Sequence, residues 1–409
     1  MSPLTDDVRL AVVGFGVRSS ELTESAHRPG TGSRIVAACD TQPQRREAAR
    51  ARYGTDLRLE ADYRALLDAE LDGVLVATPD HTHVDIAAAF LEAGIPTFVE
   101  KPLAITTDGC DRILDVALHT GTRLYVGHNM RHMPVVRAMR DLVQRGAIGQ
   151  VKAVWCRHFV GHGGDFYFKD WHADRRNTTG LLVQKGVHDI DVIHWLAGAG
   201  TKRVTALGGL SVYGEIKDRA RHDGLLMTDW LRPEENWPPL AQRGLHPVVD
   251  VEDLSMMLMQ LDGGAFASYQ QCHFTPDYWR NYTVIGTEGR LENFGDEDAV
   301  VKVWQRRSDY RDDADLVVPV SAEDGAHAGT DQRIVNEFIR FIRDGAPTVT
   351  SPIAARDAVA AACAATASLR AGGCPVDVPR PDPAVERYFE SVHLTHESAP
   401  TERAYDADR

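Results

Sequence analysis

The sequence predicts an α/β protein of two domains: a doubly wound parallel sheet with crossover helices, then an α+β domain built on an antiparallel sheet. A chain of 409 residues, 43% of them hydrophobic, is too long for one ordinary core and apolar enough to fill two. Short apolar runs alternate with helical patterns in its first third, whereas longer β-rich runs follow residue 150. These observations indicate two domains of different construction.

The first domain is expected to span residues 1–128. Strands are predicted at VRLAVVGFG (8–16), RIVAACD (34–40), LDGVLVATP (71–79), TFVEKP (97–102) and RLYVGHN (123–129). Between them PQRREAARARYG (43–54), DIAAAFLEAG (85–94) and GCDRILDVALHTG (109–121) have helical spacing and end at or near glycine. This order predicts a doubly wound sheet, in which ligands lie beyond the carboxyl ends of the strands.

The second domain is expected over residues 129–380, with a C-terminal helical region that is a candidate to pack back on the first domain. Its strands are predicted within VKAVWCRHFV, KRVTALGGLSVY, LSMMLMQLDGGAFASYQQCHF, RNYTVIGTEGRLENF and AVVKVWQRR, and Asp-Gly-Gly at 262–264 indicates a hairpin. The segment 214–250 lacks periodicity and is a candidate lid or subunit contact. Residues 381–409 are expected to form an acidic, proline-containing tail.

The composition limits the classes of partner that this protein is expected to bind. A net charge of −14 and a pI near 5.6 argue against binding nucleic acid or an anionic membrane. No stretch approaches a membrane span, and the N-terminus lacks a signal-peptide pattern, so we expect a cytoplasmic protein. Six scattered cysteines and 17 histidines show no metal-binding spacing, so no metal is expected. The expected partner is a small molecule.

A dinucleotide fingerprint lies between the first strand and the next helix. Gly14 permits a tight turn, and Gly16 lets the backbone approach a pyrophosphate at the helix N-terminus. Ser19 occupies the place of the third glycine, so the motif alone is weak. The end of the second strand strengthens it, because Asp40 can accept hydrogen bonds from both adenosine ribose hydroxyls. A carboxylate there repels a 2′-phosphate, which favours NAD over NADP, although Arg45 and Arg46 keep NADP open.

Several further motifs occur in a recognisable order: ATPDHTHVDIA, FVEKPLA, GHNMRHMPVV, LLVQKGVHDIDVIHWL and VIGTEGRLEN. Over residues 8–375 the chain resembles the glucose-fructose oxidoreductase and inositol dehydrogenase family, written Gfo/Idh/MocA. The resemblance implies a Rossmann domain followed by a C-terminal α/β domain with an open, mostly antiparallel sheet. It also implies homodimers or homotetramers formed through that sheet.

The resemblance assigns roles to individual positions. Lys101, in the family's Glu-Lys-Pro motif, is expected beside the nicotinamide and the substrate hydroxyl, and Arg131 near the nicotinamide and substrate. Together the fingerprint and the resemblance predict cofactor contacts at Gly14, Phe15, Gly16, Val17, Arg18, Asp40, Thr41, Thr78, Pro79, His81, His83, Glu100, Lys101 and Asn129.

Residues 181–196 read as one regular helix with two different faces. At about 100° per residue, Gln184, His188, Asp191 and Trp195 fall on one arc, whereas Lys185 is turned away from it. The resemblance makes this arc the substrate side. Gln184 occupies the place of the family's first aspartate and cannot take up a proton, so the aspartate-histidine relay is in doubt.

The expected chemistry is removal of a hydroxyl proton as hydride leaves carbon. Imidazole suits the base because its pKa starts near neutrality, so His188 is the predicted base and Lys101 the group that stabilises alkoxide character. A desolvated Lys101 is the alternative base. Predicted substrate contacts are Lys101, Arg131, Trp171, His172, Arg175, Gln184, His188, Asp191, His273, Tyr278 and Arg280.

Three functions compete at this stage. The leading one is an NAD(P)-dependent dehydrogenase or reductase acting on a sugar, sugar derivative or cyclitol. The alternative is an NAD-dependent glycosidase that works by transient oxidation, elimination, water addition and re-reduction, on a substrate that includes acidic sugars because arginines pair with carboxylates or sulfonates. A cofactor-binding sensor is the third, and the presence of Lys101 and His188 counts against it.

Overall fold

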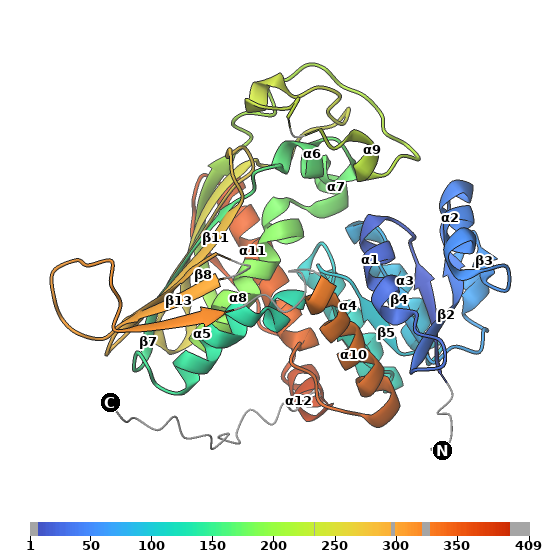
Figure 1. Ribbon diagram of the computed structural model, residues 1–409, viewed down its shortest axis with the longest axis horizontal. Coiled ribbons are helices and arrows are strands. Elements are labelled where there is room, and N and C mark those ends of the chain that lie inside the picture. The colour runs from blue at the N-terminus through green and yellow to red at the C-terminus, as the bar shows by residue number, and fades with distance from the viewer. Residues whose placement is uncertain (1–6, 233, 296–298, 321–327, 393–409) are drawn as a thin grey trace.

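The computed structural model describes residues 7–232, 234–295, 299–320 and 328–392. Two sheets organise these residues (Figure 1). A six-stranded sheet lies in the N-terminal part, and a nine-stranded open sheet lies in the C-terminal part. This is the predicted α/β architecture of a doubly wound domain followed by an α+β domain.

The first sheet is parallel, with strand order β3-β2-β1-β4-β5-β6. Its strands are β1 (Val8–Val13), β2 (Ser33–Cys39), β3 (Arg58–Glu60), β4 (Gly73–Val76), β5 (Thr97–Val99) and β6 (Leu124–Val126). Its helices are α1 (Val17–Ala26), α2 (Pro43–Tyr53), α3 (His83–Glu92) and α4 (Thr107–Thr120). Only the short edge strand β3 was not predicted, because three residues carry too little pattern.

Helix α10 (Ala328–Asp344) comes late in the chain but packs on the first domain. Ile334 and Phe338 are fully buried in one cluster with the β1 residue Leu10. The hydroxyl of Tyr125, on β6, donates to Glu337 Oε2 at 2.7 Å. The core of the first domain is therefore completed by a helix more than 300 residues downstream of β1.

The second sheet has the order β14-β13-β12-β11-β7-β10-β9-β8-β15, and β7 and β10 form its parallel pair. Its strands are β7 (Val151–Phe159), β8 (Thr201–Gly209), β9 (Leu254–Leu261), β10 (Phe266–Cys272), β11 (Trp279–Gly286), β12 (Arg290–Phe294), β13 (Ala299–Trp304), β14 (Leu316–Val320) and β15 (Val376–Asp377). The predicted turn at 262–264 joins the antiparallel strands β9 and β10.

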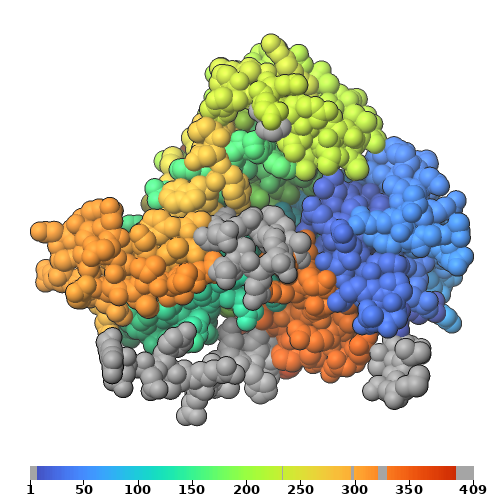
Figure 2. Space-filling view, viewed as in Figure 1, coloured from blue at the N-terminus to red at the C-terminus, as the bar shows by residue number. Residues whose placement is uncertain are grey.

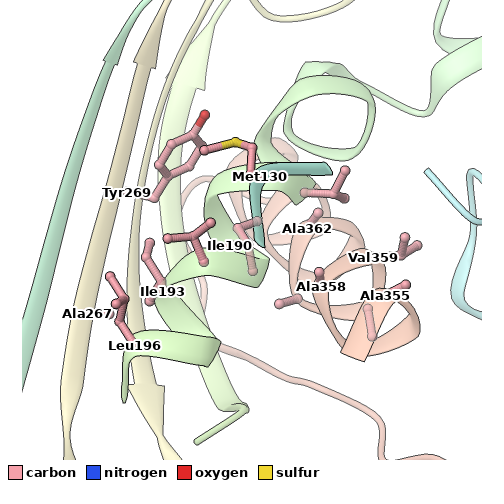
Figure 3. Close-up of a cluster of buried hydrophobic side chains, with 14 of the residues drawn as sticks. Met130, Ile190, Ile193, Leu196, Ala267, Tyr269, Ala355, Ala358, Val359 and Ala362 are labelled. Carbon is pink, nitrogen blue, oxygen red and sulfur yellow. The ribbon is translucent and has the colours of Figure 1, made fainter. Parts of the chain in front are cut away.

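Helices α5 (Pro134–Gln144), α8 (Val187–Ala197) and α11 (Pro352–Arg370) cover one face of this sheet (Figure 1). In Figure 3, α8 lies between the strands and α11, with Leu196 beside Ala267 on the sheet side and Ala358 on the α11 side. Alanines along α11 allow this close approach because their side chains are short. The remaining face of α8 packs against neither the sheet nor α11. It is left available to the candidate functional site.

The opposite face of the sheet carries exposed apolar side chains. Leu207, Met256, Leu258, Phe266 and Trp155 are between 45% and 65% exposed. Strand pairing connects them across β8, β9, β10 and β7, since Leu207 pairs with Met256 and Ser268 pairs with both Leu258 and Trp155. They form one apolar surface across four strands.

Two segments of the second half depart from simple strands and helices. Short helices α6 (Gly163–Phe168), η4 (Trp171–Ala173), α7 (Arg175–Thr178), α9 (Met227–Trp230) and η6 (Pro239–Ala241) lie around the 214–250 segment, hereafter the insert. The insert reaches the first domain (Figure 2): Gln44 and Arg45 donate to the carbonyls of Gly224 and Leu225, each at 3.4 Å. The predicted tail begins as helix α12 (Pro383–Val392), whose Val385 and Phe389 are buried, and residues 393–409 lie outside the described residues.

Candidate functional site

The glycine turn after β1 forms a cradle for a phosphate group. Gly14 has φ 85°, and a Cβ there would lie 2.6 Å from the carbonyl oxygen of Ala77. A Cβ at Gly16 would meet only Arg45 Nη1, at 3.9 Å, so the backbone is open on that side. Buried Ser19 stands in for the third glycine, with its hydroxyl donating to the carbonyl of Gly16 at 3.1 Å.

The N-terminus of α1 is suited to an anion. Neither a side-chain cap nor an acidic first-turn residue occupies it, so its free N–H groups and helix dipole face the turn. The ring of Phe15 is buried and packs edge-on against Tyr53. These features fit the pyrophosphate of a dinucleotide.

Asp40 ends β2 and organises the turn. Its Oδ2 accepts from the backbone N–H of Phe15 at 2.8 Å, and its Oδ1 accepts from that of Gln42 at 2.9 Å. Each carboxylate oxygen retains acceptor capacity for a ribose hydroxyl. Arg45 Nη1 lies 3.9 Å from Asp40 Oδ2, and Thr41 is exposed beside it.

The guanidinium of Arg18, a predicted cofactor contact, is held by two carboxylates. Its guanidinium binds Asp331 of α10 through two hydrogen bonds, at 2.5 and 2.8 Å, and donates to Glu100 Oε1 at 2.8 Å. Burial opposes the charge, but the two carboxylates outweigh it and raise the pKa of Arg18. Arg18 therefore ties α1 to α10 and fixes Glu100.

The loop after β4 is clamped to the Glu-Lys-Pro segment. The ring nitrogens of buried His83 lie 2.8 Å from the carbonyl oxygen of Pro102 and 2.9 Å from that of Thr78. Burial lowers the pKa of His83. This side chain holds two loops together rather than facing a ligand, whereas His81 is exposed and Thr78 and Pro79 are half-buried on the loop.

Lys101 joins the two domains. From the end of β5 its Nζ donates to the backbone carbonyl of Gln184 at 3.0 Å. Burial lowers the pKa of Lys101, while Asp80 and Glu100 oppose that shift. The ammonium thus lies at the start of the segment that carries His188.

That segment is not the single regular helix that the sequence predicts. Residues Leu182–Gly186 form a π-helical turn (η5), and α8 begins only at Val187. A π turn changes the angular positions of the side chains before it relative to those after it. The positive charge of Lys185 consequently acts on His158, His188 and His273, so Lys185 is not turned away from the site.

His188 is 8% exposed and its Nδ1 has no hydrogen-bond partner among the described residues. Burial lowers its pKa well below the usual range, and the nearby charges of Lys101 and Lys185 lower it further. The ring of His128 lies beside it, with centroids 6.1 Å apart. Beside Lys101, burial lowers the pKa of His172 to about 3. The imidazoles of His188 and His172 are therefore neutral near pH 7.

A fully buried carboxylate, Asp189, lies under the site. It forms an ion pair with Arg280 at 2.8 Å, lies 3.0 Å from His158 Nδ1, and accepts from the hydroxyls of Tyr269 and Tyr282. Burial alone would raise the pKa of Asp189, but Arg280 and His158 lower it. Asp189 therefore fixes the orientation of Arg280.

Asp191 and Arg131 bind each other. The guanidinium donates to both carboxylate oxygens, at 2.7 and 2.8 Å, and both side chains are buried. Arg131 also donates to the carbonyl of Val349 at 3.0 Å and lies over the Trp195 ring. The two buried side chains hold each other in place, and their predicted substrate contacts stay predictions.

The remaining predicted substrate residues divide into two groups. Trp171 and His172 stack, with ring centroids 3.7 Å apart, and buried His273 packs edge-on against Tyr167 at 5.1 Å. Tyr278 is 49% exposed at the margin. Arg175 does not belong to this group: its exposed side chain binds Asp250 at 3.0 Å and anchors the insert. Asn129 is buried at the entrance to η3 (Asn129–His132).

Sequence reasoning overlooked several groups that the fold gathers here. They are His158, Asp189, Tyr269 and Tyr282. A signal existed on the strands, because the inward alternating positions 269, 271 and 273 carry polar residues where a simple core would carry aliphatic ones. A regular helix turns Lys185 away from the arc of His188, and the π turn Leu182–Gly186 changes that placement.

Residues 8–128 match the oxidoreductase family with an NAD-binding Rossmann fold, and residues 140–378 match the C-terminal α/β domain of the same family. The chain belongs to the Gfo/Idh/MocA oxidoreductase family. Its first domain is an NAD-binding Rossmann domain.

Individual relatives are similar over part of the chain. An inositol 2-dehydrogenase of Saccharopolyspora erythraea is 34% identical over 48% of this chain and 57% of its own length. One of Burkholderia multivorans is 32% identical over 47% and 55%. The chain thus spans little more than half the length of these curated relatives.

Solved structures share the fold. Levoglucosan dehydrogenase in complex with NADH and L-sorbose has a TM-score of 0.74 at 20% identity, covering 92% of this chain and all of the other. Myo-inositol 2-dehydrogenase of Lactobacillus plantarum has a TM-score of 0.68 at 18% identity, covering 91% and 100%. Within the described ranges, no helix is long and apolar enough to span a membrane.

Proposed function

We propose that this protein is an NAD-dependent dehydrogenase that transfers hydride between the nicotinamide and a secondary hydroxyl of a sugar, sugar derivative or cyclitol. One observation carries the proposal. An ammonium from the Rossmann domain reaches a carbonyl at the head of the histidine-bearing helix, with Lys101 Nζ 3.0 Å from Gln184 O. Relatives named inositol and levoglucosan dehydrogenases support the substrate class.

We assign residues 1–128 with α10 to cofactor binding and the rest of 129–380 to the substrate. The α1 N-terminus and the turn at Gly14 and Gly16 would hold the pyrophosphate, and Asp40 the adenosine ribose. When bound, the nicotinamide accepts the hydride. Glu100 and the loop of Thr78 would border it through their place at the carboxyl edge of the sheet.

Lys101 is the better base of the two candidates. Protonated His188 would face the charges of Lys101, Lys185 and Arg280, so its imidazolium is disfavoured. Lys101 has two carboxylates near it that stabilise its protonated form. In this mechanism Lys101 takes the hydroxyl proton, and neutral His188 donates or accepts a hydrogen bond that orients the same oxygen.

The site offers polar atoms that suit a hydroxyl-rich ligand. Buried atoms without a hydrogen-bond partner among the described residues include Gln184 Oε1, His188 Nδ1, His172 Nδ1 and both ring nitrogens of His273. Such groups cost free energy unless a ligand or water binds them. Amides and neutral imidazoles both donate and accept, as hydroxyl groups do. The dehydrogenase names of the relatives give no support to the glycosidase alternative.

The exposed apolar surface on β7 to β10 is proposed as the contact of a homodimer or homotetramer. Surfaces of this kind on soluble proteins commonly mark interfaces. Placing a charge at its centre with Leu258→Glu should lower the mass measured by sedimentation. The proposal fails if wild type sediments as a monomer.

The activity test is a panel of free sugars, cyclitols including myo-inositol, levoglucosan, acidic sugars and aryl glycosides with NAD. Reduced cofactor is followed by absorbance, and aglycone release in parallel. We expect stoichiometric NADH with at least one polyol and, as an order of magnitude, roughly a 100-fold lower kcat in Lys101→Met. Aglycone release without net NADH would contradict the dehydrogenase assignment. Lys152→Met, an exposed lysine on β7, is the matched control.

A further inference from the structure

Thr179 lies in a strained turn between α7 and the π turn η5. Its φ of 65° and ψ of −45° are close to the γ-turn of positive φ, a rare conformation for a residue with a side chain. Among the described residues, Thr179 is the one non-glycine residue with a positive φ. Its β-branched side chain makes this backbone more costly still. Such an outlier persists only where the surrounding contacts hold it.

Contacts on both sides of its backbone hold Thr179 in the turn. Its N–H donates to the carbonyl of Arg175 at 2.8 Å, and its own carbonyl accepts from Arg370 Nη2 at 2.7 Å. Arg370 is fixed in turn by Glu252, because its Nε donates to Glu252 Oε1 at 2.7 Å. The turn is therefore built into the second domain.

The side chain of Thr179 reaches the first domain. Its hydroxyl donates to the backbone carbonyl of Ile105 at 2.6 Å. Ile105 follows Lys101 by four residues, and Thr179 precedes Gln184 by five. Lys101 Nζ donates to the carbonyl of Gln184 at 3.0 Å. These hydrogen bonds join segment 101–105 to segment 179–184 in antiparallel order, one bond at each end.

Other hydrogen bonds fix the course of both segments between these two ends. In the first domain, the ring of His83 lies 2.8 Å from the carbonyl oxygen of Pro102, next to Lys101. In the second domain, the carbonyl of Gly180, next to Thr179, accepts from the backbone N–H of Gln184 at 3.0 Å. A displacement of Thr179 would therefore move the carbonyl that receives the Lys101 ammonium.

We propose that Thr179 is a positioning residue for Lys101. Its hydroxyl holds the Lys101 segment of the first domain at a fixed distance from the Gln184 segment of the second. Glycine would adopt this backbone without steric cost but could not make the hydrogen bond between the domains. The proposal rests on the dehydrogenase function proposed above, since it assigns Thr179 the placement of the base.

The two domains are also joined away from the site. Arg356 of α11 donates to both carboxylate oxygens of Asp111 on α4, at 2.8 and 3.2 Å. This ion pair does not involve either segment of the site. Loss of the Thr179 hydroxyl should therefore loosen the placement of Lys101 without separating the domains.

Three variants separate the hydroxyl of Thr179 from its backbone strain. Thr179→Ser keeps the hydroxyl, Thr179→Ala removes it and keeps the strain, and Thr179→Gly removes both. Competitive labelling with acetic anhydride, read by peptide mass spectrometry, measures the reactivity of the Lys101 amine without any substrate. We expect Lys101 to react roughly two- to tenfold faster in the Ala and Gly variants, and as in wild type in Thr179→Ser. Exposed Lys152 is the internal reference.

Thermal unfolding followed by circular dichroism tests the strain and shows that each variant is folded. Thr179→Gly should unfold at a higher temperature than Thr179→Ala, because only glycine is free of strain at positive φ. Thr120, at the end of α4, is the matched control: its hydroxyl donates to the carbonyl of Val116 at 2.8 Å from a helical backbone. There the order should be reversed, with Thr120→Ala the more stable variant.

Turnover distinguishes a positioning role from a merely structural one. With a polyol that wild type oxidises, kcat should fall about tenfold in Thr179→Ala and Thr179→Gly alike, remain in Thr179→Ser, and leave NAD affinity unchanged. A structural role predicts instead that activity follows thermal stability, so that the Gly variant exceeds the Ala variant. That order, or wild-type labelling of Lys101 in folded Thr179→Ala, overturns the proposal. Wild type that oxidises no polyol would contradict the proposed function, whereas the labelling result would still decide the role of Thr179.

Discussion

At residue scale the site is a set of charges arranged around neutral imidazoles. Gln184 carries an amide where the family motif has a carboxylate, and its backbone carbonyl receives the Lys101 ammonium. Lys185 adds a positive charge that lowers the pKa of His188. Because His188 is buried, water screens this charge less than it would at the surface. The amide at 184 adds no negative charge that would raise the pKa of Lys101.

Gln184→Asp should add a negative charge to the group of charges around Lys101. A carboxylate beside Lys101 stabilises the ammonium and raises its pKa, so the acid limb of polyol oxidation should move about one unit to higher pH. The pH dependence of kcat/KM measures the shift. Gln150→Asp, at an exposed position, introduces the same charge outside the site and should leave the limb in place.

At the scale of elements, the glycine turn and the π turn place the two halves of the site. Gly14 lies so close to Ala77 that β1 and β4 leave no room for a side chain. The η5 turn presents the Gln184 carbonyl to Lys101 of the first domain and places the charge of Lys185 near His188. Both are backbone features that a few residues determine.

Gly14→Ala should weaken NAD binding. A Cβ would lie 2.6 Å from the carbonyl of Ala77, in addition to the strain of a positive φ. Gly94→Ala is the matched control: Gly94 has φ 75°, a Cβ there would meet no atom within 4 Å, and the change should cost only about 1–2 kcal/mol. Calorimetric titration with NAD should show roughly a tenfold loss or more for Gly14→Ala alone. Equal effects in both variants would mean that backbone strain, not the clash, governs the turn.

At the scale of the whole molecule, burial of uncharged histidines links stability to pH. Burial lowers the pKa of His158 to about 3 and of His194 to about 4, and that of His273 well below its usual range. Well above the ordinary histidine pKa of about 6.5, these rings are neutral in both folded and unfolded chains. Between that value and the folded pKa only the unfolded chain takes up the protons, so stability falls as pH falls.

Urea unfolding should therefore show a free energy of unfolding that declines steeply below about pH 6.5. Each such histidine contributes ~1.4 kcal/mol per pH unit. His273→Phe keeps an aromatic ring beside Tyr167 and removes one proton site, so its slope should be shallower by that amount. His119→Gln, at an exposed position, should leave the slope unchanged. A slope that is the same in all three proteins would mean that His273 is not buried as a neutral ring.

Local sequence patterns predicted the fold class and a cofactor-binding turn, and the family resemblance pointed to Lys101 and His188 as candidates. Alternating strands and helices, Gly14 and Gly16 before α1, and Asp40 after β2 are each readable within a few residues. The tertiary structure alone decided which polar groups act on one another. Arg18 faces Asp331, Arg131 faces Asp191, and Asp80 acts on Lys101 because strand neighbours and distant helices meet in space. Electrostatic interactions depend on distance and burial, which linear spacing does not contain.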